Sequence, residues 1–392
     1  MKKRLLFVYH EMIIGGSTTS LLSILNLIDY DRFEVDLLLY YNQGALFDQI
    51  PKQVNILPQA SIFPPAAKSL KTLRSVLRGD IQRALYYGVC YEYKLKLNRQ
   101  AMECARVTNS RWVEAEYYAA IGFLEGWPND YVALKAKAKK KIGWVHVDWK
   151  GSYLKANIDG RVYAKLDNIV LVSQKCRDNF IDMFPKARSK AVYIENILSQ
   201  GAIRNMANQF VPDLVVDEAK INLVSVCRIE FSSKGLDRGV KAFAKLKEER
   251  LIEDFHWYII GDGSDIDNLK NMKAENMLDE YITVLGSRNN PLPYVTLMDV
   301  FFLPSRFEGK PIAVTEAQML GVPALVTAYA SANEQIENGI DGVILENTDD
   351  AIYAGLRHMV GQKSKINLMK QNAYNRDYSN MEAIEAIHNI VG

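Results

Sequence analysis

The sequence predicts an α/β protein of two doubly wound domains, each a mostly parallel sheet covered by helices, facing each other across a cleft. Short apolar strands alternate with longer amphipathic segments along the chain. The alternation stops once, in a polar stretch at 199–219, and then restarts. The 392 residues suffice for two such domains. Because open parallel sheets bind ligands at the carboxyl ends of their strands, a functional site is expected in the cleft.

The N-terminal domain is predicted to span 1–198. It opens with the buried-strand pattern Leu5–Tyr9, followed by Gly15-Gly16-Ser17 and a helix to about Ile28. Further strands are predicted at 35–41, 119–123, 142–146, 169–172 and 191–194. The two glycines allow the backbone to approach a ligand closely, because a Cβ at these positions would obstruct it.

The C-terminal domain is predicted to span 199–376. Its first part, 199–219, contains Pro212 and shows no clear periodicity, which predicts a linker. Strands are predicted at 222–227, 256–260, 282–285, 300–303 and 324–326. The segment 381–391 is predicted to be helical and follows an irregular stretch near Asp377.

Composition excludes several classes of protein. The net charge of +2 provides no overall attraction to nucleic acid. The four cysteines are Cys90, Cys104, Cys176 and Cys227. They form no C-x-x-C pair, and their spacings fit no zinc motif. We therefore expect a protein of the cytoplasm, where thiols stay reduced. No apolar stretch approaches the ~20 residues of a membrane span. The apolar run that ends before His10 is too short for a signal peptide.

The segment 302–323 carries the strongest functional signal. An apolar strand is followed by a loop with Glu308 and then by a helix whose first turn suits Pro311. Gly321 fits the position just after the end of this helix. Glu316 therefore lies more than one turn inside the helix. Free amides at the helix start, together with the helix dipole, form a natural phosphate site.

Glu308 and Glu316, with seven residues between them, resemble the paired-glutamate motif of glycosyltransferase family 4, whose members have the GT-B fold. The resemblance covers essentially the whole chain. The segment 226–237 resembles the Arg…Lys-Gly segment of the family, 142–148 resembles its histidine segment, and Ile260-Gly-Asp-Gly and Leu285-Gly resemble two further landmarks. Two glutamates at this spacing are a weak signal alone, and their order among these segments makes it strong.

The resemblance implies two Rossmann-like domains, with a final helix at 377–392 that crosses back onto the first. Arg228 and Lys234 would neutralise the leaving diphosphate, so that no metal or other cofactor is required. Glu316 would hydrogen-bond the ribose, Glu308 would lie near the donor sugar, and His146 would face that sugar from the N-terminal domain. Further donor contacts are expected from Gly15, Gly16, Ser305, Gly309, Lys310, Pro311 and Ile312.

The implied activity is that of a retaining hexosyltransferase in bacterial surface polysaccharide biosynthesis. The donor would be a nucleotide sugar, with UDP favoured because it is frequent in the family, and the acceptor a glycan or lipid-linked saccharide. By position, Glu125, Gly126 and Trp127 are expected on the acceptor side, where aromatic rings stack on sugars.

Other functions stay open beside this one. A non-catalytic sugar-nucleotide-binding partner of another transferase would keep the fold and lose the charged residues, all of which are present here. A sugar-nucleotide epimerase or a phosphorylase can share the fold. Asp265 and Asp267 form a D-x-D pair that elsewhere binds a metal, but here they open a predicted helix, where acidic residues favour the dipole. The absence of G-x-G-x-x-G weakens a dinucleotide-dependent oxidoreductase.

Two basic stretches bear on membrane contact. At 68–78, Leu70, Leu73, Val76 and Leu77 share one helical face and cations occupy the rest, while lysines cluster at 135–141. Either a core-packed helix with a solvated face or peripheral contact with the inner membrane leaflet fits this pattern. The oligomeric state is left open by the sequence.

Overall fold

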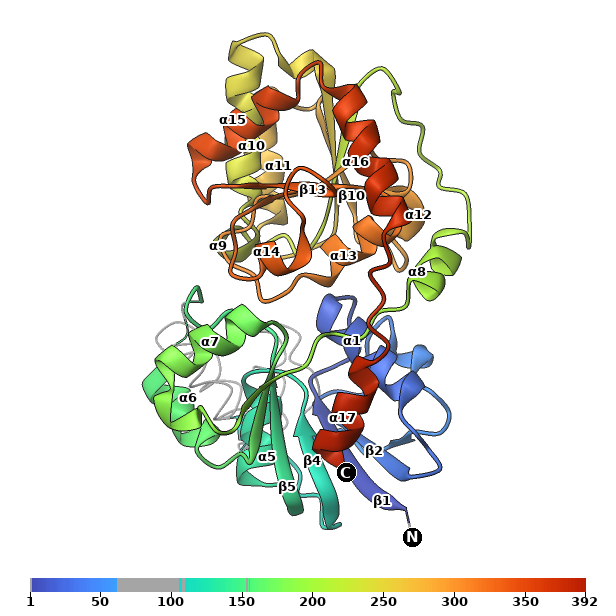
Figure 1. Cartoon of the computed structure of the whole chain (residues 1–392), viewed down its shortest axis with the longest axis vertical. Helices are drawn as coiled ribbons and strands as arrows, with labels where there is room; N and C mark the ends of the chain where they lie inside the picture. Colours follow the sequence, from blue (N-terminus) through green and yellow to red (C-terminus); the bar gives the residue numbers. More distant parts are fainter. Residues whose placement is uncertain (1, 62–105, 108–109, 153, 155) are drawn as a thin grey trace, which may run out of the picture.

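The computed structural model describes residues 2–61, 106–107, 110–152, 154 and 156–392. It contains two α/β domains, each built on a parallel sheet with helices on both faces (Figure 1). The predicted fold class is therefore confirmed. The basic stretch at 68–78 and the cysteines Cys90 and Cys104 lie outside the described residues. Within the described chain, no helix is both long enough and apolar enough to cross a membrane.

The N-terminal sheet has the strand order β3-β2-β1-β4-β5-β6-β7, and all its pairs are parallel. The strands are β1 Lys3–Tyr9, β2 Phe33–Leu39, β3 Asn55–Ile56, β4 Tyr117–Gly122, β5 Ala138–Val145, β6 Asn168–Leu171 and β7 Ala191–Tyr193. The covering helices are α1 Gly16–Leu27, α5 Trp127–Leu134, α6 Ala156–Tyr163 and α7 Gln174–Met183. The central strand β1 is apolar on both faces because helices bury both sides of the sheet.

The C-terminal sheet repeats this plan in the order β10-β9-β8-β11-β12-β13. Its strands are β8 Ile221–Val226, β9 Phe255–Ile260, β10 Ile282–Gly286, β11 Val300–Leu303, β12 Ala324–Thr327 and β13 Gly342–Leu345. Its helices are α9 Phe231–Lys234, α10 Leu236–Glu248, α11 Ile266–Glu275, α12 Leu292–Val295, α13 Ile312–Met319, α14 Ala332–Gln335, α15 Asp349–Met359 and α16 Lys363–Asn375. In both sheets the order reverses beside the first strand, which is where doubly wound folds bind ligands.

The last helix, α17 Ala383–Val391, lies on the N-terminal domain although the preceding helix belongs to the C-terminal one (Figure 1). It buries Ile387, Ile390 and Val391 in the same core as β1. The chain thus crosses between the domains twice. Asn380 ties the two crossings together, because its amide donates to the Asn196 carbonyl at 2.7 Å and its side-chain oxygen accepts from the Leu198 N–H at 2.8 Å.

The predicted linker at 199–219 was wrong in its first half, which forms helix α8 Gln200–Ala207. Ser199 caps this helix by accepting from the Ala202 N–H, and Arg204 fixes it to the C-terminal domain by donating to the Met319 carbonyl at 3.0 Å. The helix is only two turns long, so its periodicity is too short to stand out in the sequence. Strand β13 was also missed, since its four residues carry little signal.

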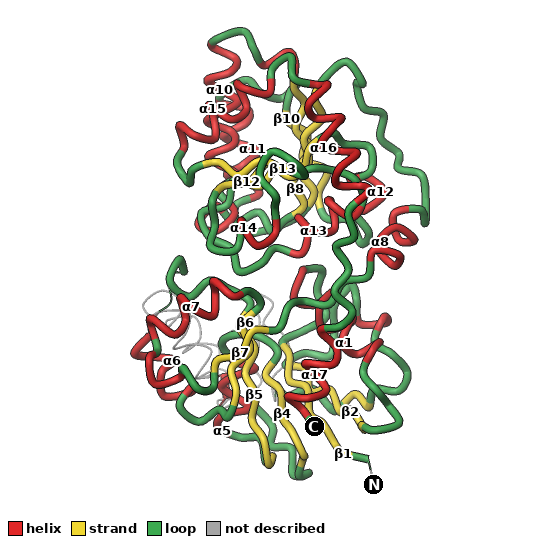
Figure 2. The backbone as a smooth tube through the Cα atoms, viewed as in Figure 1, coloured by secondary structure: helices red, strands yellow, loops and turns green. Residues whose placement is uncertain are grey.

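In Figure 2 the two domains face each other through loops and helix ends. The loop after β5 touches the loop after β11 there, since a Cβ on Gly309 would lie 1.9 Å from the His146 carbonyl oxygen. Contacts across this interface are close. The Sγ atom of Cys176 lies 3.4 Å from the Gly309 carbonyl oxygen, and a Cβ on Gly16 would lie 3.5 Å from that of Ile312. The carboxyl edges of the two sheets therefore form one composite site.

Candidate active site

The centre of the site is a partly buried ion pair between two predicted residues. The Nζ atom of Lys234 donates to both carboxylate oxygens of Glu308, at 2.6 and 2.8 Å. The Ser305 hydroxyl, fully buried, donates to one of these oxygens at 2.7 Å. Lys234 ends helix α9, where Gly235 adopts φ +63° and where a Cβ would lie 2.2 Å from the Pro304 carbonyl oxygen. Only glycine allows the Lys234 turn to approach the Glu308 loop this closely.

A second ion pair holds these two loops together. The Arg306 guanidinium donates to both oxygens of Asp237, at 2.7 and 2.8 Å, and also to the Phe231 carbonyl. A bidentate pair of this kind fixes orientation as well as distance. Sequence reasoning missed both residues, although each lies within a segment that carried the resemblance.

Arg228 follows β8 and is exposed. Its side chain forms no hydrogen bond or ion pair with any residue that the structure describes. Burial raises the pKa of Tyr9, while hydrogen bonds with Ser17 and Thr18 and the charge of Arg228 lower it. Arg228 of one domain therefore lies near Tyr9 of the other. Because the Tyr9 hydroxyl contacts the start of helix α1, this cation lies near the end of the β1–α1 loop, which ends at Gly15.

Glu316 lies in the second turn of α13, half-buried. Desolvation raises its pKa to about 7. Among the described residues, no side chain or main-chain group hydrogen-bonds to its carboxylate. An acceptor that is partly desolvated and has no protein partner is suited to binding ligand hydroxyls.

The raised pKa makes a prediction for Glu316→Gln. Between the ordinary pKa of 4.5 and about 7, the folded protein keeps a proton that the unfolded chain has released, so the stability contributed by this group falls as the pH rises through this window. Glu316→Gln should therefore be more stable than the wild type at pH 8, by about 1–3 kcal/mol, and equally stable near pH 4.5. Denaturant unfolding at both pH values tests this. The exposed Glu275→Gln is the control, and a gain that is the same at both pH values would contradict the assignment.

His146 directly follows β5 and faces the site from the N-terminal domain. One ring nitrogen hydrogen-bonds the Phe123 carbonyl, while Nε2 is buried without a partner in the described structure. Burial lowers its pKa to about 3, so the ring is neutral at physiological pH. Its main-chain N–H donates to the Glu125 carboxylate at 3.0 Å. The ring is thus placed to bind a neutral polar group and does not supply a positive charge.

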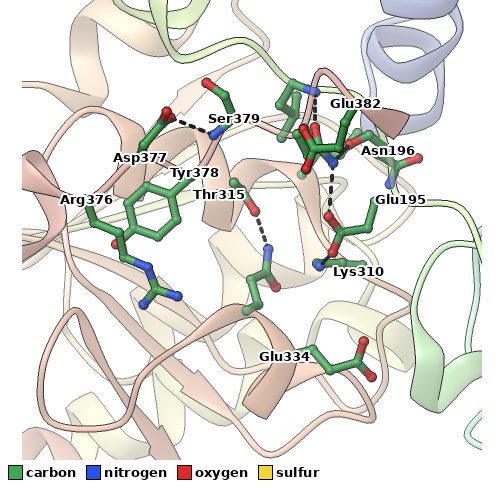
Figure 3. Close-up of a pocket in the computed structure, with 14 residues that line it drawn as sticks. Glu195, Asn196, Lys310, Thr315, Glu334, Arg376, Asp377, Tyr378, Ser379 and Glu382 are labelled. Carbon is green, nitrogen blue, oxygen red and sulfur yellow. Dashed lines mark hydrogen bonds and ion pairs between the residues drawn. The ribbon is translucent and has the colours of Figure 1, made fainter. Parts of the chain in front are cut away.

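The loop after Glu308 takes part in the contact between the domains. A Cβ on Gly309 would lie 1.9 Å from the His146 carbonyl oxygen, so this glycine permits the close approach, and its contact with the donor stays a prediction. The Lys310 ammonium pairs with Glu195 beside the interdomain crossing, in a polar pocket (Figure 3). Its contact with the donor stays a prediction.

The remaining residues that were predicted to contact the donor lie in different surroundings. Helix α13 begins at Ile312, so Pro311 precedes the first turn and does not lie in it. Ile312 packs against Gly16, whereas a Cβ on Gly15 would meet no atom within 4 Å. Gly15 therefore faces open space, which leaves its main chain accessible to a ligand.

One prediction on the acceptor side, that for Trp127, requires correction, and those for Glu125 and Gly126 stay predictions. Trp127 is fully buried, and its indole N–H donates to Ser110 at 2.9 Å, so its ring belongs to the core and has no free face for a sugar. Gly126 adopts φ +82° at the start of α5, a turn that requires glycine whatever binds nearby. Glu125 is half-buried and holds the main chain of His146. The sequence near the end of a strand does not show whether an aromatic side chain such as that of Trp127 points into the core or into the site.

The lysines at 135–141 do not all lie free on the surface. Lys135 is nearly buried, donates to the Ser110 carbonyl at 2.6 Å and lies over the Trp112 ring. Lys137 pairs with Glu114 at 2.8 Å. The cluster therefore does not present five free cations to one surface.

Neither aspartate of the D-x-D pair belongs to a metal cluster in the described chain, where no group of three or more potential ligands gathers. Asp265 accepts from the Phe231 N–H at 2.9 Å and from Asn268 at 2.8 Å. Asp267 lies in the first turn of α11. These contacts tie α11 to the Lys234 turn.

Comparison with known proteins agrees with the two-domain fold. Over the whole chain, the structure matches TarM from S. aureus, solved with fondaparinux, alpha-GlcNAc-glycerol and UDP (TM-score 0.68, 12% identity, 100% of both chains), and Anabaena HepE, solved with UDP (TM-score 0.66, 13% identity, 99% of both chains). The fold is that of the GT-B glycosyltransferases. Residues 208–376, which carry Arg228, Lys234, Glu308 and Glu316, match the family model of glycosyl transferases group 1. This part of the chain is therefore similar to the group 1 glycosyltransferases.

Curated relatives match over a part of the chain. The chain is 31% identical over 144 residues to UDP-Gal:alpha-D-GlcNAc-diphosphoundecaprenol alpha-1,3-galactosyltransferase of Escherichia coli, covering 36% of this chain and 37% of that protein. It is 24% identical over 166 residues to the O-antigen biosynthesis glycosyltransferase WclY of Escherichia coli, covering 42% and 44%. The matched regions thus span less than half the length of these relatives.

Proposed function

We propose that this protein is a retaining, metal-independent glycosyltransferase. It transfers a hexose or related sugar from a UDP-sugar to a glycan or lipid-linked acceptor during assembly of a bacterial surface polysaccharide. Support for the sugar donor and the pathway comes from relatives whose names include UDP-Gal, diphosphoundecaprenol and O-antigen biosynthesis. The N-terminal domain binds the acceptor and the C-terminal domain binds the donor.

The observation that carries the proposal is the placement of two cations and two carboxylates at one sheet edge. When the sugar bond breaks, negative charge develops on the diphosphate, and Arg228 and Lys234 supply fixed positive charge there. Glu308 holds Lys234 in place at 2.6 Å, which prevents the ammonium from rotating away. Glu316 accepts hydrogen bonds from the ribose hydroxyls. From the other domain, the neutral His146 ring binds a hydroxyl of the transferred sugar.

Thermal melting with a panel of nucleotides tests the donor assignment. UDP and UDP-sugars should raise the melting temperature, because a ligand that binds only the folded state stabilises it in proportion to the logarithm of its excess over Kd. The shift should persist in chelator, whereas GDP, ADP and dTDP should shift it less. A shift that requires manganese would contradict the metal-independent site, and no shift with millimolar UDP-sugars would contradict the proposal.

Product analysis separates transfer from other reactions of this fold. Incubation of the responding UDP-sugar with lipid-linked acceptors should release UDP and extend the acceptor with retained anomeric configuration. Conversion of the donor into its epimer without UDP release would instead identify an epimerase.

A further inference from the structure

Helix α7 of the N-terminal domain begins directly opposite α14 of the C-terminal domain (Figure 1). A helix start leaves several main-chain N–H groups without partners inside the helix. Ser173 satisfies one of them by accepting from the Cys176 N–H at 3.0 Å. The two N–H groups that precede it in the helix are satisfied from the other domain. The Glu334 carboxylate accepts from the Gln174 N–H at 3.0 Å and from the Lys175 N–H at 2.7 Å.

This contact is suited to hold the domains together reversibly. Glu334 is exposed, so water can replace both amides when the domains separate. In the closed form the anion lies at the positive end of the α7 dipole, and charge-assisted hydrogen bonds of this kind are stronger than neutral ones. Glu334 also lines the pocket that Asn196 and Asn380 of the two crossings line (Figure 3). The contact with α7 thus adds a non-covalent tie between the domains beside the covalent crossings.

The contact also leads directly to the reacting groups. Cys176, one residue beyond Lys175, donates its thiol to the Gly309 carbonyl at 3.4 Å. Ser331, on the same turn as Glu334, donates to that carbonyl too. Gly309 in turn rests on the main chain of His146. Docking of α7 thus fixes the spacing between the Glu308 loop and the His146 ring.

We propose that Glu334 is a positioning residue, which closes the interdomain site by capping helix α7 across the domain interface. The proposal rests on the proposed function for its effect on sugar transfer, since only a closed site brings His146 to the donor and excludes water. The cap itself does not depend on that function. The donor-binding residues Arg228, Lys234 and Glu316 all lie in the C-terminal domain, so loss of the cap should affect turnover more than nucleotide binding.

The test compares Glu334→Ala and Glu334→Gln with the wild type, with Glu346→Ala as the matched control. Glu346 is exposed in the same domain, and none of the described residues hydrogen-bonds to its side chain. Hydrogen exchange followed by mass spectrometry reads the amides of Gln174 and Lys175, small-angle scattering with UDP reads closure, and transfer assays read kcat and KM.

In Glu334→Ala, these two amides should exchange about tenfold faster, the scattering should show a more open molecule, and kcat should fall about tenfold with less than about twofold change in the Kd for UDP. Glu334→Gln keeps one strong acceptor oxygen and should be intermediate, while Glu346→Ala should match the wild type. Unchanged exchange at Gln174 and Lys175 would overturn the cap. Faster exchange with unchanged kcat would overturn its role in positioning.

The melting temperature of Glu334→Ala shows how much of the variant is folded under the assay conditions. If the loss of kcat is explained entirely by a smaller folded fraction, Glu334 has a structural role only, and the positioning role is overturned. If the wild type neither binds UDP nor transfers sugar, the proposed function fails. Amide exchange and scattering still decide in that case whether Glu334 closes the domains, because neither readout requires turnover.

Discussion

Lys234→Ala should lower the turnover of sugar transfer by roughly 100-fold to 1000-fold. The ammonium lies where charge develops on the leaving diphosphate, and a preorganised cation in a partly desolvated site contributes far more than one in water. The substitution also leaves the Glu308 carboxylate, only 8% exposed, without its cation. Stability should therefore fall as well, because an unpaired buried charge is costly. Turnover is best measured well below the melting temperature of the variant.

Lys241→Ala is the control for this effect. Lys241 lies on α10 in the same domain, is exposed, and forms only a long ion pair with Asp349 at 3.7 Å. It should transfer sugar like the wild type. A turnover of Lys234→Ala within about threefold of the wild type would remove Lys234 from the reaction.

Glu308→Gln should lower turnover by roughly 100-fold while changing UDP affinity much less. The amide keeps the shape of the side chain and its contact with Ser305 but removes the charge that orients Lys234. Since the two residues form one unit, the double variant Lys234→Ala/Glu308→Gln should be no slower than Lys234→Ala alone.

Glu248→Gln is the control for Glu308→Gln, because it also removes one carboxylate, from an exposed position on α10. Steady-state kinetics of the two single variants and the double variant complete the cycle. Strictly additive losses would show that Lys234 and Glu308 act independently, contrary to the 2.6 Å contact between them.

The sequence was most informative where a signal is local. Strand and helix alternation predicted both sheets, since apolar runs between polar turns are written in consecutive residues. The segment 302–323 indicated its strand, loop and helix and placed Glu316 inside the helix, as the structure has it. Short elements were not predicted. Helix α8 Gln200–Ala207 is an example, because two turns contain too few residues to establish a period.

Only the tertiary structure decided which of the predicted residues touch. Lys234 and Glu308 are 74 positions apart, and Lys310 and Glu195 are 115 apart, so no local pattern records that the first pair forms in the site and the second beside the crossing. Burial of Trp127 was likewise settled by packing against residues distant in sequence.

The sequence by itself determined the fold class and the match of residues 208–376 to the group 1 glycosyltransferase model, because both depend on periodicity and on short motifs in a fixed order. The tertiary structure decided the pairing of charges, the direction of each side chain and the cap that Glu334 places on α7. These depend on how two separately folded sheets dock, and docking is set by surfaces assembled from residues far apart in the chain.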